Sequence, residues 1–171
     1  SELFDRDDIR HMFRHLKQGK VLWYAPDQDY GELHAVYAQF FGNAAATITT
    51  PSRFAKINNS PTIILRYRRR ADNRGYITDY ERVPDNWPQS DDIHDAAQIN
   101  TLIEKAIRLA PEQYKWMHKH FKTQPGGKPE SPYIFIKTPV SRLQSQRLQE
   151  MLEVEGVRIN TLPTESRTAF Y

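Results

Sequence analysis

Two aspartates separated by a single glutamine are the first residues along the chain whose spacing suggests chemistry. Asp27 and Asp29 lie in "WYAPDQDYG", directly after a short apolar run. A D-x-D pair at a strand end can bind Mg²⁺ or Mn²⁺ beneath a nucleotide-sugar diphosphate, because hard cations prefer carboxylate oxygens. The same aspartates can instead accept loop N–H groups beside Pro26 and Gly31. The spacing alone leaves both readings open.

A row of arginines in "LRYRRR" is the second candidate. Alternation in a strand would place Arg66, Arg68 and Arg70 on one face, with Tyr67 on the other. Such a row could hold phosphates or follow a nucleic acid backbone, or it could be a solvated face that prevents edge aggregation. The chain has 24 Lys and Arg against 21 Asp and Glu, a net charge of +3. This near balance argues against nucleic acid as a partner.

The histidines form two loose pairs, and neither has the spacing of a metal site. His11 and His15 lack the intervening glutamate of H-E-x-x-H, and spacing supplies no third ligand. His118 and Lys122 belong to a basic stretch. The sequence has no cysteine and no G-x-S-x-G elbow, which excludes a thiolate nucleophile and argues against a serine hydrolase. We therefore expect neither a metal nor a cofactor.

In the first third of the chain, the sequence predicts two helices and a strand that would position the candidate residues. Apolar periodicity predicts a helix over residues 5–18, and "KVLWYA" predicts a short buried strand over residues 20–25. That strand would place the aspartates at its carboxyl end, where ligands bind in α/β sheets. Residues 32–50 are apolar but poorly periodic and indicate a partly buried loop. A helix is expected over residues 51–58, with Thr50 as its N-cap.

A hairpin and a long helix are expected next. "PTIILRYRRR" and "GYITDYERV" flank the turn sequence "ADNRG" and predict a β-hairpin. One apolar face predicts a helix over residues 92–110, and a second helical piece is expected over residues 111–122. Beyond the linker "TQPGGKPESP" we expect a strand at "YIFIK" and a helix over residues 141–153. The sequence contains no apolar run long enough for a membrane span, and its first residues do not resemble a signal peptide.

The order of these segments resembles a known family. "LKQGKVLWYAPDQDYG", "FFGNAAAT", "TTPSRFAKI" and "APEQYKWMHKHFKTQPGGKPESPY" are similar to the C-terminal half of the lipid A late acyltransferases. These are the lauroyl and myristoyl transferases of lipopolysaccharide biosynthesis, in the lysophospholipid acyltransferase superfamily. The resemblance covers about residues 4–133, so we divide the chain into an acyltransferase portion, 1–133, and a tail, 134–171, outside the resemblance.

The resemblance implies an α/β fold, namely the C-terminal half of a lysophospholipid-acyltransferase-like mixed sheet flanked by helices. It implies acyl-acyl carrier protein as donor, a lipid A precursor as acceptor and a place at the cytoplasmic face of the bacterial inner membrane, peripheral or anchored by sequence upstream of Ser1. Eight residues become candidate substrate-binding residues: Asp27, Asp29, Tyr30, Arg53, Arg66, Arg68, His118 and Lys122. Two aromatic and three small residues could line an acyl channel or simply form core: Phe40, Phe41, Ala44, Ala45 and Ala46.

The chain departs from the family at its catalytic pair, a His followed five positions later by an acidic residue. None of the six histidines has Asp or Glu at that position. We therefore assign no catalytic residue, expect the pair in an upstream half, and expect this chain to be inactive alone. A further departure is "WMHKHFKTQ", where Lys119, His120 and Gln124 replace arginines of the family pattern. The alternatives that remain are a D-x-D glycosyltransferase fragment and an Arg-rich nucleic-acid-binding module.

Overall fold

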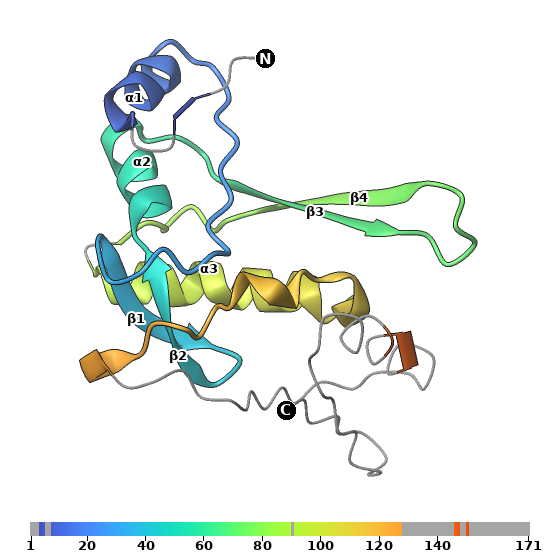
Figure 1. The fold of residues 1–171 in the computed structure, drawn as a ribbon. Helices are drawn as coiled ribbons and strands as arrows, with labels where there is room; N and C mark the ends of the chain where they lie inside the picture. The colour runs from blue at the N-terminus through green and yellow to red at the C-terminus, as the bar shows by residue number, and fades with distance from the viewer. Residues whose placement is uncertain (1–3, 6–7, 90, 128–145, 148–149, 151–171) are drawn as a thin grey trace.

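The computed structural model describes residues 4–5, 8–89, 91–127, 146–147 and 150. Within them the chain forms two separate antiparallel hairpins and three α-helices (Figure 1). The elements are α1 (Ile9–Lys17), β1 (Ala35–Phe40), β2 (Asn43–Ile48), α2 (Thr50–Asn58), β3 (Ile63–Arg69), β4 (Tyr76–Arg82) and α3 (Asp92–Ile107), followed by 3₁₀ turns at Pro111–Gln113, Trp116–His118 and Pro125–Gly127. In Figure 1, α3 lies across the β1–β2 hairpin, while β3 and β4 extend away as a long arm.

The predicted loop over residues 32–50 is wrong, because most of it is the β1–β2 hairpin. Ala35 pairs with Ile48 and Phe40 with Asn43. Phe41 and Gly42 both have positive φ, 48° and 79°, the backbone of a two-residue turn that matches strand twist. The alternation that marks a strand is hidden in the sequence because β2 is buried on both faces over its last four residues.

The predicted buried strand over residues 20–25 is also wrong. This segment belongs to neither sheet, and Val21 and Trp23 are 90% and 73% exposed. An apolar run becomes a strand only when a second strand lies beside it, and the described residues pair none with it. The α/β class is confirmed, whereas the larger mixed sheet flanked by helices is not found in the part of the chain that the structure describes.

The helices predicted over residues 5–18, 51–58 and 92–110 are confirmed in place, with small shifts at their ends. Asp8 caps α1 by accepting a hydrogen bond from the His11 N–H at 3.0 Å. The N-cap of α2 is Thr49 instead of the expected Thr50, and the Thr49 hydroxyl bonds the His34 carbonyl at 3.3 Å instead of capping the helix. Helix α3 ends at Ile107, three residues before the expected end.

The helix predicted over residues 111–122 is wrong. Its place is taken by two 3₁₀ turns, between which Tyr114 is extended (φ −81°, ψ 142°). Lys119 is left-handed, with φ 46°, so the backbone cannot continue a helix through this position. The strand predicted at "YIFIK" lies outside the described residues. Of the helix predicted over residues 141–153, only residues 146–147 and 150 are described, and these are helical.

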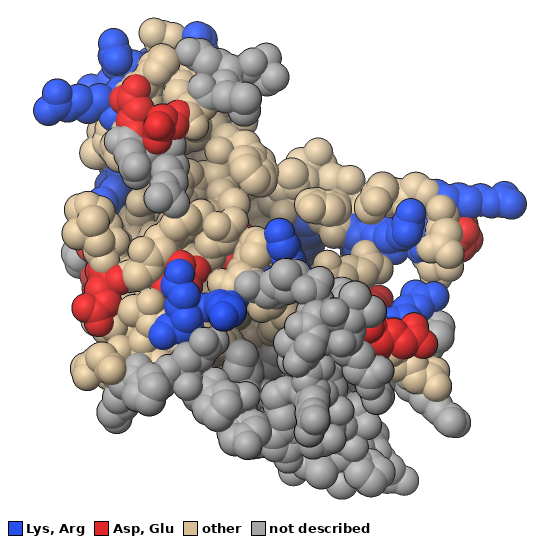
Figure 2. Space-filling view, viewed as in Figure 1, with Lys and Arg blue, Asp and Glu red and all other residues tan. Residues whose placement is uncertain are grey.

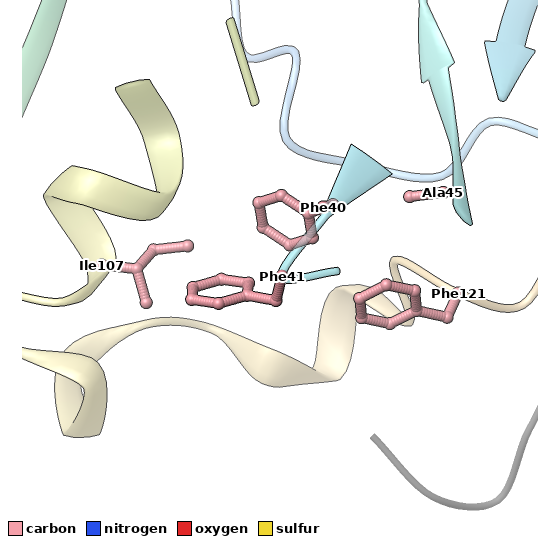
Figure 3. Packing of buried hydrophobic residues seen from close by; sticks show 5 residues of the cluster. All are labelled: Phe40, Phe41, Ala45, Ile107 and Phe121. Carbon is pink, nitrogen blue, oxygen red and sulfur yellow. The ribbon is translucent and has the colours of Figure 1, made fainter. Parts of the chain in front are cut away.

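The core lies on both sides of α3. Figure 3 shows the first cluster, in which the hairpin turn meets the end of α3 and the 3₁₀ region; its residues are Phe40, Phe41, Ala45, Ile107 and Phe121. The second cluster joins α2, α3 and the loop after β4 and contains Ala55, Val83, Trp87 and Ile99. Asn100 of α3 is buried between them and donates to the Gln39 carbonyl (3.1 Å) and the Thr47 hydroxyl (2.9 Å). This bond anchors α3 to the β1–β2 hairpin.

The β3–β4 hairpin is confirmed and forms the arm. Ile63 pairs with Arg82 and Arg69 with Tyr76. Burial alternates strictly along both strands, so Arg66 and Arg68 share a half-buried face as the alternation predicted. The opposite face is exposed.

Candidate functional site

Two motif blocks that are distant in sequence meet in space, and Asp29 joins them. Its carboxylate is 5% exposed. One oxygen accepts from the Gly31 N–H (2.9 Å) and the Thr123 hydroxyl (2.8 Å), and the other accepts from the Thr123 N–H (2.8 Å). Because Asp29 and Thr123 are 94 residues apart, this clamp fixes the "DQDYG" loop against the chain between the second and third 3₁₀ turns.

A second contact between the blocks involves Tyr114 and Asp27. The Tyr114 hydroxyl lies 3.5 Å from the Asp27 backbone oxygen. Burial, followed by the nearby Asp27 carboxylate, raises the pKa of Tyr114 far above its usual range. Tyr114 is therefore a neutral hydrogen-bond donor at any physiological pH. The Asp27 side chain stays half-buried.

Tyr37 of β1 closes a third contact to the same region. Its hydroxyl donates to the Glu32 carboxylate at 2.6 Å and lies 3.1 Å from the Gln124 backbone oxygen. The hydrogen bond to Glu32 raises the pKa of Tyr37 to about 12. Gln124 in turn donates to the Ala44 carbonyl of β2 at 3.3 Å. The β1–β2 hairpin thus holds the chain on both sides of the Asp29 clamp.

His120 lies buried behind this junction. It is 5% exposed, and its ring stacks on Phe40 with centroids 4.4 Å apart. Neither ring nitrogen has a hydrogen-bond partner among the described residues. Burial lowers the pKa of His120, although the carboxylates of Asp27 and Asp29 partly oppose this shift. A neutral imidazole therefore lies within electrostatic range of the two acids.

The remaining candidates near the junction lie on its more open side. Tyr30 is 37% exposed, and Lys122 is exposed. His118 is half-buried, and its Nδ1 is buried with no hydrogen-bond partner among the described residues. Asp27, Tyr30, His118 and Lys122 all belong to the two blocks that the Asp29 clamp joins.

The three candidate arginines lie elsewhere and already have acidic neighbours. Arg66 pairs with Glu81 at 2.5 Å and Arg68 with Asp79 at 2.6 Å, both across the arm. Arg53 of α2 is 3.9 Å from Asp92 and half-exposed. Sequence reasoning did not foresee these partners, because strand register decides which acids oppose which arginines.

The alternatives to a substrate-binding site receive no support from this geometry. Both Asp29 oxygens are occupied by the protein's own donors, and the described residues contain no cluster of three or more metal-ligating side chains. The guanidinium groups of Arg66 and Arg68 form ion pairs with acidic side chains and do not present their charge to a nucleic acid. The proposed acyl-channel residues Phe40, Phe41 and Ala45 pack as core.

Sequence reasoning missed three residues that build the site: Tyr37, Tyr114 and Thr123. The last two carry hydroxyls in the block "EQYKWMHKHFKT", which also contains the candidates His118 and Lys122, and this shared block is a local signal that could have identified them. Tyr37 gave no signal because it lies in the stretch that was expected to be a loop.

Comparison with known proteins finds a family match that contains both blocks. A profile described as bacterial lipid A biosynthesis acyltransferase matches residues 1–123. The chain is 40% identical over 129 residues to the lipid A biosynthesis lauroyltransferase of Escherichia coli (strain K12), covering 74% of this chain and 42% of that protein. It is 35% identical over 133 residues to the palmitoleoyltransferase of the same organism, covering 77% and 43%.

A third relative is more distant. The E. coli (strain K12) lipid A biosynthesis myristoyltransferase is 30% identical over 122 residues, covering 71% of this chain and 38% of that protein. In all three cases the chain spans about two-fifths of the relative's length.

Proposed function

The chain belongs to the bacterial lipid A biosynthesis acyltransferase family, and from this premise we propose that it contributes the acceptor side of the acyl-transfer site. The reaction is transfer of a fatty acyl chain from acyl carrier protein to a hydroxyl of a lipid A precursor. The observation that supports this role best is the Asp29–Thr123 clamp. It joins the two motif blocks through which the chain resembles the family.

The two aspartates of the "DQDYG" loop would have different roles. Asp29 has its oxygens occupied and is 5% exposed, so it positions the loop. Asp27 is half-buried and carries no ion pair among the described residues, so its carboxylate can accept a hydrogen bond from a sugar hydroxyl of the acceptor. Tyr30 and His118 lie in the same two blocks and would contact the sugar from either side.

Lys122 and Arg53 would be the main residues that bind a phosphate of the acceptor. Lys122 is exposed, and Arg53 is half-exposed at 3.9 Å from its acid, a distance that leaves its guanidinium donors largely free. To bind a phosphate, Arg66 and Arg68 would have to give up their ion pairs with Glu81 and Asp79. The net free energy of binding gained from this exchange would be close to zero. We therefore rank these two arginines below the other candidates.

The proton-abstracting base is expected from elsewhere in the family's polypeptide. No histidine of this chain is followed at the family spacing by an acid, and a His with an orienting carboxylate is the base that the resemblance implies. A lipid acceptor implies action at the cytoplasmic face of the inner membrane. No helix in the described residues combines the length and apolar character needed to cross a bilayer.

A chimera tests the acceptor-side role. The 129 matched residues of the E. coli lauroyltransferase are replaced by the corresponding residues of this chain, and acyl transfer to a lipid A precursor is measured. We expect the chimera to be active, and Asp27→Ala in it to lower kcat/KM at least tenfold without changing its melting temperature. Asp85→Ala, an exposed aspartate on the loop after β4, is the matched control and should have no effect.

Two results would refute the proposal. An inactive but folded chimera would show that these residues cannot serve the family reaction, and an Asp27→Ala chimera with full activity would remove Asp27 from the site. The 171-residue chain alone should show no turnover, and measurable turnover by it would contradict the need for the absent His and acid.

A further inference from the structure

The hydroxyl of Tyr114 reaches Asp27, the aspartate to which we assign the acceptor hydroxyl. It lies 3.5 Å from the Asp27 backbone oxygen and also interacts with the Asp27 carboxylate. A separation of 3.5 Å is longer than the usual hydrogen bond between two oxygens, and a carboxylate is a stronger acceptor than a carbonyl. The carboxylate is therefore the main acceptor of the Tyr114 proton.

This proton stays on Tyr114 throughout the physiological pH range. Burial, followed by the charge of Asp27, raises the pKa of Tyr114. A phenol has one hydrogen to donate, whereas a carboxylate has two oxygens that can accept. The bond from Tyr114 thus leaves the other oxygen of Asp27 available for a second donor.

The ring that carries the hydroxyl is fixed by aromatic packing. Tyr114 meets the ring of Trp116 edge-on, with centroids 4.9 Å apart and an interplanar angle of 83°, and it packs against the first core cluster. Trp116 is held in turn, because its indole N–H donates to the Pro111 carbonyl at 2.9 Å. The hydroxyl therefore approaches Asp27 from a rigid support.

The Asp27 side chain has no other group to orient it among the described residues. It forms no ion pair within them, and it differs in this from Asp29, whose two oxygens are both occupied. His120 lies within electrostatic range, but neither of its ring nitrogens has a hydrogen-bond partner in the described part of the chain. Tyr114 is thus the group that can orient Asp27.

We propose that Tyr114 is a positioning residue for the acceptor. Its hydroxyl donates to one oxygen of the Asp27 carboxylate and fixes the direction of the other, which accepts the sugar hydroxyl of the lipid A precursor. This inference rests on the proposed function and adds to it the residue through which the second motif block acts on the first.

Orientation of the carboxylate matters because acyl transfer requires the acceptor hydroxyl in one geometry. A carboxylate that can rotate binds the hydroxyl in several directions and holds it less well. Loss of the Tyr114 hydroxyl should therefore weaken binding of the acceptor and leave binding of the acyl donor unchanged. A merely structural role for Tyr114 would affect both substrates alike.

Tyr114→Phe in the chimera of the preceding section tests this role, because it removes the hydroxyl and keeps the ring. We expect the KM for the lipid A precursor to rise at least about fivefold, as for the loss of a hydrogen bond to a charged group. The KM for acyl-acyl carrier protein and the circular dichroism spectrum should not change. Tyr80→Phe is the matched control and should have no effect, since Tyr80 is 71% exposed on the arm, which projects from the body of the molecule (Figure 2).

A double variant shows whether Tyr114 acts through Asp27. Once Asp27→Ala has removed the carboxylate, Tyr114→Phe should cause no further loss of kcat/KM, because the two residues work as a unit. A loss that persists in the Asp27→Ala background would mean that Tyr114 acts through another group.

A measurement without turnover follows the contact in the 171-residue chain itself. With ¹³C-labelled aspartate, the carboxyl carbon signal of Asp27, assigned by its absence in Asp27→Ala, should shift in Tyr114→Phe. The signal of Asp29 is the internal control and should stay in place, because its donors are Gly31 and Thr123.

Three outcomes would overturn the inference: an unchanged acceptor KM for Tyr114→Phe in a chimera that Asp27→Ala impairs, a double variant that loses more than Asp27→Ala alone, or an Asp27 carbon signal that does not move. An inactive chimera, or one that Asp27→Ala leaves fully active, would refute the proposed function. The carbon signal then still decides whether Tyr114 orients the carboxylate.

Discussion

The β1–β2 hairpin and the β3–β4 arm are two antiparallel hairpins of the same chain that distribute their side chains in opposite ways. The first places Phe40 and Ala45 in the core against α3. The second turns its charged face toward the body of the molecule and its aromatic face toward solvent. Both obey the alternation of a strand, so the difference lies in what each hairpin has beside it.

Only the first hairpin is stabilised mainly by what it buries. The arm is attached to the body by Ile64, which packs against the second core cluster, and by polar contacts. Gln113 pairs with the backbone of Arg69 (2.6 Å from its N–H), and Lys105 of α3 reaches Glu81 at 2.7 Å. Exposed ion pairs contribute little to stability. The comparison therefore predicts large mutational effects in the first hairpin and small ones in the arm.

Phe40→Ala should have the largest effect. Phe40 is fully buried, so we expect a loss of about 3–5 kcal/mol in the free energy of unfolding, from lost burial and the cavity left behind. The measurement is urea unfolding followed by circular dichroism. The same truncation in the arm, Tyr67→Ala, should change stability by less than about 0.5 kcal/mol. Equal losses at the two positions would contradict the comparison.

Asp29→Ala should have the next largest effect, because it leaves three part-buried donors without their acceptor: the Gly31 N–H, the Thr123 N–H and the Thr123 hydroxyl. We expect a loss of about 2–3 kcal/mol, together with faster amide exchange at Thr123. Asp27→Ala, two positions away, should cost far less, since the only donor that interacts with that carboxylate among the described residues is the Tyr114 hydroxyl, which also contacts the Asp27 backbone oxygen. If the two variants lose the same stability, Asp29 is not a clamp.

The free energy of unfolding should depend on pH because of the protonation of His120 in the core. Burial lowers its pKa in the folded state, so the unfolded state binds the proton first. Stability contributed by the neutral ring is present above about pH 6.5 and falls as the pH drops below it, by at most about 1.4 kcal/mol per pH unit. His120→Phe preserves the stack on Phe40 and should flatten this decline. An unchanged pH profile would show that His120 is not its source.

The smallest expected effect is Lys105→Ala, which removes a link between the arm and α3. Its hydrogen bond is the main cause that lowers the pKa of Glu81. That contribution is present above the ordinary pKa of a glutamate, about 4.3, and is lost as the pH falls. We expect a loss of about 0.5 kcal/mol near neutral pH that disappears in 1 M salt. A loss above about 2 kcal/mol would mean that the arm depends on this ion pair.

The arm was predictable from sequence and the first hairpin was not. "ADNRG" between two β-branched, aromatic runs is a local turn signal, and the alternation of Arg66 and Arg68 predicted their shared face. The turn of the first hairpin is Phe41–Gly42, and β2 after it is buried on both faces from Ala45 to Ile48. Periodicity cannot reveal a strand that has no polar face.

The candidate site was predictable in its residues but not in its arrangement. The aspartates and the "EQYKWMH" block were visible as motifs, yet which aspartate faces the protein and which remains available depends on a contact across 94 residues. The helix expected over residues 111–122 fails for a similar reason. Pro111 is buried shortly after α3, and Lys119 has the left-handed conformation that interrupts a helix.

The sequence by itself determined family membership, the α/β class, the arm and its face pattern, because these depend on motifs and on spacing within a few residues. Only the tertiary structure decided that Asp29 is a clamp and that Arg66 and Arg68 are paired with acids. It also showed that "KVLWYA" is paired with no strand among the described residues. A strand is stable only when a neighbouring strand completes its hydrogen bonds. An apolar run in the sequence indicates that such a neighbour is needed, but it does not show that one is present.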